Sequence, residues 1–331
     1  MNSYKNILLI NFGGIGDEIL FMPVIQGLKK EFPNAKLTLC LEGRSSAFLK
    51  LTDLLDSYFF VDIKTSNKYV EMLKLYFKAL TGKYDLVVSS GSNPLISILL
   101  FCTGIKTRVG YASSTISKKL LTYPVRLNKN QYASMMYFDL IRPLVDFEYE
   151  LPHIKVAEHV KMPNSVLVHP GVSAVSISKN IIKTITAKKW AEIIKGLLKK
   201  GKKVHLAGGP DDSDCITQIR EELRSEDLTN FTDMYGKTKN IFDLAELIKK
   251  SEILICSDSA PMHIGVATNT KTFAIFGPTD DKKLLPDSDN FTAIKNDVDC
   301  RPCLWEKRQT TCQNLSCLDI SVDEIVDKIC L

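Results

Sequence analysis

The sequence has no long apolar run. None of its apolar stretches approaches the roughly 18 to 20 consecutive residues that a membrane-spanning helix requires. The N-terminus also lacks the pattern of a secretory signal, because a single lysine precedes only the short run NILLI at residues 6–10. These two absences predict a soluble, cytoplasmic protein.

The sequence also lacks the compositional bias of a disordered protein. Hydrophobic residues make up 45% of the chain and charged residues 24%, which is typical of packed globular proteins. A chain of 331 residues exceeds what one hydrophobic core usually supports. We therefore expect two domains of roughly 150 residues each.

The excess of positive charge is small and confined to one half of the chain. Residues 1–160 contain 19 Lys and Arg against 14 Asp and Glu, whereas residues 161–331 contain 24 of each kind. This density is too low for a nucleic-acid-binding surface, so no nucleic-acid partner is expected. Two interpretations remain: solvated surface lysines, or a first domain that meets an anionic partner such as a phosphorylated acceptor or an acidic membrane surface.

The nine cysteines are not expected to form a disulfide framework in a cytosolic chain. Four are scattered and are interpreted as small core residues: Cys40, Cys102, Cys215 and Cys256. Four others share one 18-residue window: Cys300, Cys303, Cys312 and Cys317. Their C-x2-C and C-x4-C steps are close to the spacing at which four thiolates bind one tetrahedral metal ion.

Apolar runs bounded by turns alternate with helical patterns along the first half. Strands are predicted at 5–12, 35–42 and 84–90, and helices at 18–32 and 94–104. This β-α-β-α order is typical of a parallel sheet with helices on both faces.

The same order restarts after a linker-like stretch at 148–164. Strands are predicted at 165–170, 203–209, 252–259 and 271–277, and helices at 187–201, 241–251 and 261–269. The chain is therefore predicted to fold as two successive doubly wound α/β units with a cleft between two lobes.

The stretch NFGGIGDEIL at residues 11–20 follows the first predicted strand. A dinucleotide fingerprint needs a third small residue after Gly14 and Gly16, and that residue is missing here. A tight turn that presents Asp17 toward the cleft at the start of a helix is the interpretation that remains. A plain helix-capping carboxylate explains Asp17 equally well.

A second polar cluster, ICSDSAPMHIG at residues 255–265, ends another buried strand. Ser259 can cap the following helix, Pro261 suits its first turn, and the exposed N–H groups of a helix start favour an anion. A structural cap explains Ser259 and Pro261, but it does not explain why the strand runs into Asp258, Ser259 and His263 together.

The third cluster is the loop that begins at Gly171 and Ser173 and ends at Lys183, just before an amphipathic helix that carries Trp190. A single lysine near a helix start is usually a surface residue. Opposite an anion-binding helix terminus across a cleft, Lys183 becomes a candidate phosphate ligand.

These motifs together resemble a known family. The G-x-G-D turn, HPG followed by K-x6-W, GGPDD and DSAPMH occur in the order seen in the ADP-heptose:lipopolysaccharide heptosyltransferases, glycosyltransferase family 9. The resemblance implies the GT-B fold, with two Rossmann-like domains facing a central cleft. It implies an acceptor-binding domain at 1–160 and a nucleotide-sugar-binding domain at 161–331, with a Cys-rich segment at 300–317.

The resemblance also implies roles for individual residues. Asp17 matches the general base, Lys183 the lysine that contacts the donor diphosphate, and Asp212 the carboxylate near the ribose. Residues implied on the donor side are Gly171, Ser173, Lys183, Asp212, Asp258, Ser259, Ala260, Met262 and His263. Residues implied on the acceptor side are Gly14, Gly16 and Arg108.

The implied reaction is inverting, metal-independent transfer of heptose or a related sugar from an ADP-heptose-like donor. The acceptor would be a lipopolysaccharide core or another surface glycan, and the basic first half favours an anionic glycolipid in peripheral contact with the inner membrane. The alternatives are a protein-modifying enzyme and a non-catalytic nucleotide-sugar-binding protein. Some family members carry iron at a C-terminal cysteine cluster, which implies structural zinc or iron at the four-cysteine window.

The chain departs from the family pattern near the donor lysine. The usual K-R-W-P is replaced by Lys183-Thr184-Ile185-Thr186, the loop before Lys183 is longer than usual, and Ala260 replaces a common glycine. These departures concern the identity of the sugar more than the class of reaction.

Overall fold

The computed structural model describes residues 3–172, 176, 178–179, 181–224, 228–304, 312 and 314–331. The chain divides into two compact units, Met1–Lys155 and Val156–Leu331. Each unit contains a six-stranded sheet in which every pair of neighbouring strands is parallel. The prediction of two doubly wound α/β units is confirmed.

The first unit alternates strands and helices along its whole length. Its elements are β1 (Asn6–Ile10), α1 (Ile15–Glu31), β2 (Lys36–Leu41), η1 (Gly43–Leu51), β3 (Ser57–Phe60), α2 (Lys68–Thr81), β4 (Leu86–Ser89), α3 (Pro94–Cys102), β5 (Thr107–Tyr111), α4 (Thr115–Leu120), β6 (Tyr123–Val125) and α5 (Ala133–Phe138). The strand order is β3-β2-β1-β4-β5-β6. The central strands β1, β2 and β4 are nearly continuous buried runs, as expected where helices cover both faces.

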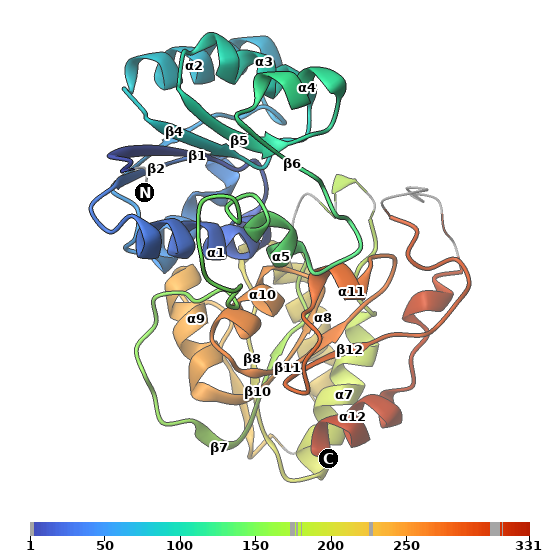
Figure 1. The fold of residues 1–331 in the computed structure, drawn as a ribbon. Coiled ribbons are helices and arrows are strands. Elements are labelled where there is room, and N and C mark those ends of the chain that lie inside the picture. The colour runs from blue at the N-terminus through green and yellow to red at the C-terminus, as the bar shows by residue number, and fades with distance from the viewer. Residues whose placement is uncertain are drawn as a thin grey trace. The chain divides into compact units, whose positions relative to one another are not determined.

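Two helical layers enclose the first sheet. α2, α3 and α4 form one layer, whereas α1 and α5 lie on the opposite face (Figure 1). Inner residues of α2 and α3, such as Leu75, Ala79, Ile96 and Leu100, pack against the sheet in one hydrophobic cluster.

The second unit repeats this arrangement. Its elements are β7 (Met162–His169), α7 (Ala187–Lys199), β8 (Lys203–Leu206), η2 (Pro210–Asp212), α8 (Ser213–Leu223), β9 (Phe231–Asp233), α9 (Ile241–Lys250), β10 (Ser251–Ser257), α10 (Ala260–Ala267), β11 (Lys271–Ile275), α11 (Asp281–Leu284), β12 (Phe291–Ile294), η3 (Ser316–Leu318) and α12 (Val322–Cys330). The strand order is β12-β11-β10-β7-β8-β9. Trp190 of α7 is fully buried in the core that α7, α8 and α12 form against the sheet.

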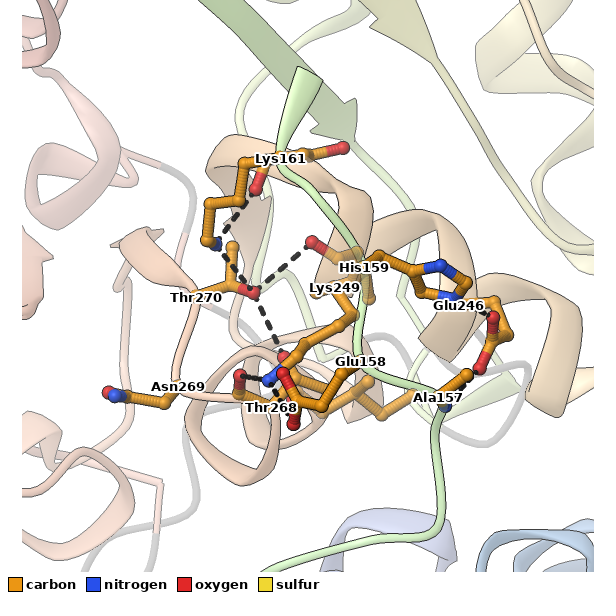
Figure 2. A network of polar contacts seen from close by, with 12 residues as sticks. Ala157, Glu158, His159, Lys161, Glu246, Lys249, Thr268, Asn269 and Thr270 are labelled. Atoms are coloured by element: carbon orange, nitrogen blue, oxygen red, sulfur yellow. Dashed lines mark hydrogen bonds and ion pairs between the residues drawn. The ribbon is translucent and has the colours of Figure 1, made fainter. Parts of the chain in front are cut away.

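Residues 156–161 belong to the second unit because their side chains and backbone are bound to it. The Glu246 carboxylate of α9 accepts a hydrogen bond from the Ala157 N–H at 2.8 Å and pairs with the His159 ring (Figure 2). Lys161 Nζ donates to the Ser251 carbonyl at 3.0 Å. The boundary between the units therefore lies between Lys155 and Val156. The sequence predicted it five residues later, after residue 160.

Both sheets contain a topological switch point. In the first unit the chain order reverses between β1 and β4, and in the second between β7 and β10. Open parallel sheets bind ligands at the carboxyl ends of the strands at such points. In the part of the chain that the structure describes, no helix is long and apolar enough to cross a membrane.

Candidate active site

Asp17 lies in the first turn of α1, at the switch point of the first sheet. Its Oδ2 atom accepts a hydrogen bond from the Gly14 backbone N–H at 2.8 Å, which completes half of a capping box. The side chain is half-buried, and none of the described residues donates a hydrogen bond to Oδ1. One oxygen therefore stabilises the helix start, while the other can accept a proton from a ligand.

The glycine loop allows the chain to approach this carboxylate closely. A Cβ atom at Gly13 would lie 2.2 Å from the Cβ of Asp17, far inside contact distance. Gly14 is the N-cap residue of α1, and Gly16 lies in the first turn of that helix. The structure thus brings Gly14, Gly16 and Asp17 together, as the sequence predicts.

Glu18 is a buried carboxyl group beside Asp17. It has 0% exposure, and neither carboxyl oxygen makes a hydrogen bond among the described residues. Burial raises the pKa of Glu18 well above its ordinary value, and the charges of Asp17 and Glu42 raise it further, although the nearby polar groups of Asn11 and Ser45 oppose the shift. The protonated form is therefore favoured.

Two cations border the same loop and were not anticipated from the sequence. Arg44 Nε pairs with Glu42 Oε2 at 2.5 Å, and a Cβ at Gly14 would lie 3.8 Å from the Arg44 guanidinium. Lys64 Nζ donates to the Phe12 carbonyl at 3.0 Å. Their positions in the sequence could have indicated this, because Arg44 follows the carboxyl end of β2 and Lys64 follows that of β3.

Arg108 does not join this group. Arg108 is the second residue of β5 and pairs with Val87 of β4. It therefore lies two residues before the carboxyl end of β4, where Ser89 pairs with Gly110. Its Nε donates to the Leu120 carbonyl at 2.9 Å, Nη1 donates to backbone carbonyls of the preceding turn, and the guanidinium lies over the Phe101 ring. The guanidinium is thus occupied in joining β5 to the α2–α4 layer, and the structure does not bring it to Asp17.

In the second unit, Asp258 is the centre of a polar cluster at the carboxyl end of β10. Its Oδ2 atom accepts hydrogen bonds from Lys183 Nζ at 2.8 Å and from Thr279 Oγ1 at 2.6 Å. The Asp258 side chain is 3% exposed and that of Lys183 17%. The sequence predicted Lys183 and Asp258 in one site, but it gave no signal for Thr279, which comes from the loop after β11.

Hydroxyl groups tie the loop after β7 to β10. Ser257 Oγ donates to the Pro170 carbonyl at 2.8 Å and contacts Thr184 Oγ1 at 2.7 Å. Trp190 Nε1 donates to the same Thr184 hydroxyl at 2.9 Å. Thr184 therefore links the loop after β7 to β10 at the switch point.

The N-terminus of α10 faces this cluster without a side-chain cap. Ser259 is the N-cap residue, but its hydroxyl donates to the Gly171 carbonyl at 3.0 Å instead of capping the helix that Ala260 begins. A helix start of this kind favours an anion. Met262 and His263 follow in the same helix and are buried.

Asp212 packs directly against Gly171. Its Oδ2 atom accepts a hydrogen bond from the Gly209 N–H at 2.7 Å, and a Cβ at Gly171 would lie 2.1 Å from its carboxylate. Burial raises the pKa of Asp212, although the hydrogen bonds from Gly209 and Val172 oppose this shift. The carboxylate therefore fixes the loops after β7 and β8. Ser173, which the sequence also predicted in this set, lies outside the described residues.

The four cysteines of the window lie in different surroundings. Cys317 is buried in the hydrophobic core, Cys300 is exposed, and Cys312 Sγ donates to the Asn314 carboxamide oxygen at 3.3 Å. Burial raises the pKa of Cys303 and Cys317, and neighbouring cysteines raise both further. Across the described ranges, no group of three or more His, Cys, Asp or Glu could hold a metal ion. The metal site expected from the cysteine spacing stays a prediction, because residues 305–311 and 313 of the window lie outside the described residues.

Comparisons with known proteins agree with this architecture. The model of glycosyltransferase family 9 (heptosyltransferase) matches residues 73–314. Lipopolysaccharide heptosyltransferase 3 of Escherichia coli is 26% identical over 302 residues, which cover 83% of this chain and 84% of that protein. The structure of E. coli ADP-heptose lps heptosyltransferase II has a TM-score of 0.74 at 18% identity, and the match covers 98% of this chain and 97% of that one.

A third relative contains iron. The bacterial iron-containing dodecameric glycosyltransferase TibC from enterotoxigenic E. coli has a TM-score of 0.59 at 12% identity, and the match covers 99% of this chain and 79% of that one. At this identity the likeness concerns the fold alone. The family match spans well over half of the chain, and the chain therefore belongs to glycosyltransferase family 9 as a glycosyltransferase with the GT-B fold.

Proposed function

We propose that this enzyme is an inverting heptosyltransferase that transfers heptose from an ADP-heptose-like donor to an acceptor of the lipopolysaccharide core. Its similarity to lipopolysaccharide heptosyltransferase 3 of E. coli supports the acceptor class. The name of ADP-heptose lps heptosyltransferase II, whose fold it shares, supports the donor class. The observation that carries the proposal is Asp17, a carboxylate held at a switch point with one oxygen left for a ligand.

Asp17 is the proposed general base. Its Oδ1 atom takes the proton of the acceptor hydroxyl while the acceptor oxygen bonds to the anomeric carbon. The bond between that carbon and the donor phosphate breaks on the opposite face, so the configuration inverts. Arg44 and Lys64 beside the glycine loop favour an acceptor that carries phosphate or another anionic group.

The departing nucleoside diphosphate is proposed to bind the second unit. Its developing negative charge is stabilised by the uncapped start of α10, at Ser259 and Ala260, and by the ammonium group of Lys183. Lys183 already pairs with Asp258, which holds the ammonium group near the helix start. The proposed donor set also includes Gly171, Ser173, Asp212, Met262 and His263, and Asp212 acts there by holding the loop at Gly171.

Each of the two units therefore has one proposed binding role. The first unit, predicted at 1–160 and ending at Lys155, binds the acceptor, and the second unit, from Val156 to Leu331, binds the nucleotide sugar. No step of this chemistry passes through a metal ion, since the base and the cationic groups named above perform it.

The test of the base is Asp17→Asn. An asparagine oxygen can still accept the Gly14 hydrogen bond, so the helix start is kept while the base is lost. We expect turnover of ADP-heptose with a lipopolysaccharide-core acceptor to fall by about 10²- to 10⁴-fold, while calorimetric titration gives an unchanged Kd for ADP. Unchanged turnover would refute the assigned base.

The donor site is tested in the same titrations with a panel of nucleoside diphosphates. Lys183→Ala should weaken ADP binding by at least about tenfold, the effect of losing one charge-assisted contact, whereas Lys179→Ala, an exposed lysine nearby, should not. Selective binding of a different nucleotide would replace the donor but keep the reaction. Binding of ADP without transfer to any glycan acceptor would favour the non-catalytic or protein-modifying alternative.

A further inference from the structure

α2 is apolar on two sides, which is unusual for a helix on a protein surface. Leu75 and Ala79 face the sheet and are buried. On the other side Tyr69, Leu73 and Phe77, spaced four residues apart, are 82%, 56% and 53% exposed. An ordinary surface helix has one apolar stripe and a polar outer face, so burial within this unit does not explain the outer stripe of α2.

The outer sides of α3 and α4 continue this apolar surface. The three helices form one layer over the sheet, with α3 in contact with both α2 and α4 (Figure 1). Nine of the fourteen exposed large hydrophobic residues of the described chain belong to them, and we call these nine the outer apolar face: Tyr69, Val70, Leu73, Phe77, Leu80, Leu95, Ile98, Phe101 and Ile116. Their concentration in one layer marks an interaction surface.

Positive charge is concentrated in the segment of the chain that carries this face. Residues 64–122 contain nine Lys and Arg but only two acidic residues, whereas the whole chain has a net charge of +5. The remainder of the chain is therefore slightly acidic. Both acidic groups already accept hydrogen bonds: Glu71 from the Asp62 N–H at 2.8 Å, and Asp85 from the backbone N–H groups of Lys5 and Asn6.

We propose that the outer apolar face docks on the surface of an anionic phospholipid bilayer. Aromatic and aliphatic side chains enter the interface between headgroups and acyl chains, and the lysines of the same segment bind lipid phosphates. Docking of a second copy of the chain on this face would bring the lysines of two identical surfaces together. Repulsion between these like charges disfavours such a dimer. This inference does not rest on the proposed sugar transfer, although an enzyme docked in this way would meet an acceptor anchored in the same bilayer.

The position of the face relative to Asp17 is consistent with such an acceptor. α2, α3 and α4 each follow the carboxyl end of a strand, so their first turns lie at that edge of the sheet. Tyr69, Leu95 and Ile116 belong to these first turns. Asp17 lies at the carboxyl edge of the same sheet. Docking through the outer sides of α2, α3 and α4 therefore leaves this edge, which carries the proposed base, uncovered.

The test is flotation of the full-length protein with vesicles of phosphatidylcholine alone or mixed with about one third phosphatidylglycerol. We expect binding to the anionic vesicles, little binding to the neutral ones, and loss of binding at 1 M salt, where charge is screened within about 3 Å. These vesicles contain no glycolipid, so binding cannot come from acceptor recognition. Equal binding to both vesicle types, or no binding, would overturn the proposal.

Matched variants separate the two parts of the surface. Lys78→Glu with Lys118→Glu should weaken vesicle binding by at least about tenfold, whereas the same charge change at exposed residues of the other unit, Lys188→Glu with Lys199→Glu, should not.

Leu73→Ser with Phe77→Ser should also weaken binding at least about tenfold, and Tyr58→Ser, an exposed aromatic residue outside the face, should leave it unchanged. ADP binding, measured by calorimetry, should be the same in all variants, so failure of this proposal is distinguishable from failure of the proposed function. A concentration-dependent dimer that the serine variants abolish, without vesicle binding, would assign the face to a second copy instead.

Discussion

Asp17 shows how one residue can satisfy two interpretations that looked exclusive in the sequence. A helix-capping carboxylate and a base were alternatives there, but the structure gives the cap to Oδ2 and leaves Oδ1 without a donor among the described residues. Asp212 has the same capping position after Gly209, yet its carboxylate packs on Gly171 and is buried. The sequence pattern is similar at both sites, and only packing distinguishes them.

Glu18 gives the first prediction, because its folded-state pKa is raised by burial. A carboxyl group with a raised folded pKa destabilises the fold progressively as pH rises above its unfolded pKa, about 4.3. Glu18→Gln removes this ionisation. We therefore expect the Tm of the variant at pH 8 to exceed that of the wild type by at least about 2–4 °C, and the difference to vanish near pH 4.

The control for Glu18 is Glu31→Gln, at the other end of α1, where the side chain is only half-buried. This variant should show no such pH-dependent gain in Tm. A Glu18→Gln protein that is less stable than the wild type at pH 8 would mean that the ionised carboxylate has a partner in solution and is needed in that form.

At the scale of elements, strands that are buried on both sides could be predicted from the sequence. The predicted strand at 5–12 contains β1, and the predicted helix at 18–32 largely coincides with α1. The edge strands β3, β6, β9 and β12 were not predicted, since they have three or four residues and no run of buried side chains. The interior strand β5 was also missed, because only its last three residues are buried. Their pairing is decided by the neighbouring strand, which local sequence does not report.

The candidate site was predictable only where its residues follow a buried strand. Asp17 and Asp258 do so, and Lys183 precedes a clear helix. Thr279, Arg44 and the contact between Asp212 and Gly171 depend on which loops meet in space, which sequence spacing does not show. Arg108 illustrates the opposite case, because this basic residue of an interior strand contacts backbone carbonyls, which its position in the sequence did not indicate.

The contact between the β7 and β8 loops gives a prediction at this scale. Gly171→Ala would force its Cβ into the Asp212 carboxylate, 2.1 Å away. We expect the substitution to displace the loop that meets Ser259 and to weaken ADP binding by about tenfold or more, as measured by calorimetry, since a misplaced loop loses a charge-assisted contact.

A double-mutant cycle tests the cause of that loss. Asp212→Ala removes the obstacle, so Gly171→Ala should cost much less in the Asp212→Ala background than in the wild type. Additive effects of the two substitutions would show that Gly171 is required for its backbone and not for the space it leaves to Asp212.

At the scale of the whole molecule, the chain is two units joined through a segment that the second unit holds. The pKa of Glu246 is lowered although burial opposes this, because the Ala157 N–H and His159 favour the ionised carboxylate. A lowered folded pKa stabilises the fold above the unfolded pKa of about 4.3, and this stabilisation is lost as pH falls further. The segment 156–161 should therefore be held firmly at neutral pH.

Limited trypsin digestion at pH 7.5 measures this anchoring, because Lys155 directly precedes the segment and Lys161 is its last residue. In Glu246→Gln the neutral amide keeps at most weaker contacts with the Ala157 N–H and the His159 ring. We expect cleavage at these lysines to be several-fold faster than in the wild type, producing two fragments of nearly equal size. Glu192→Gln on α7 is the control and should be cleaved at the wild-type rate. If both variants were cleaved at that rate, the segment would be held by Lys161 and its carbonyl partner, and Lys161→Gln would then be the variant that releases it.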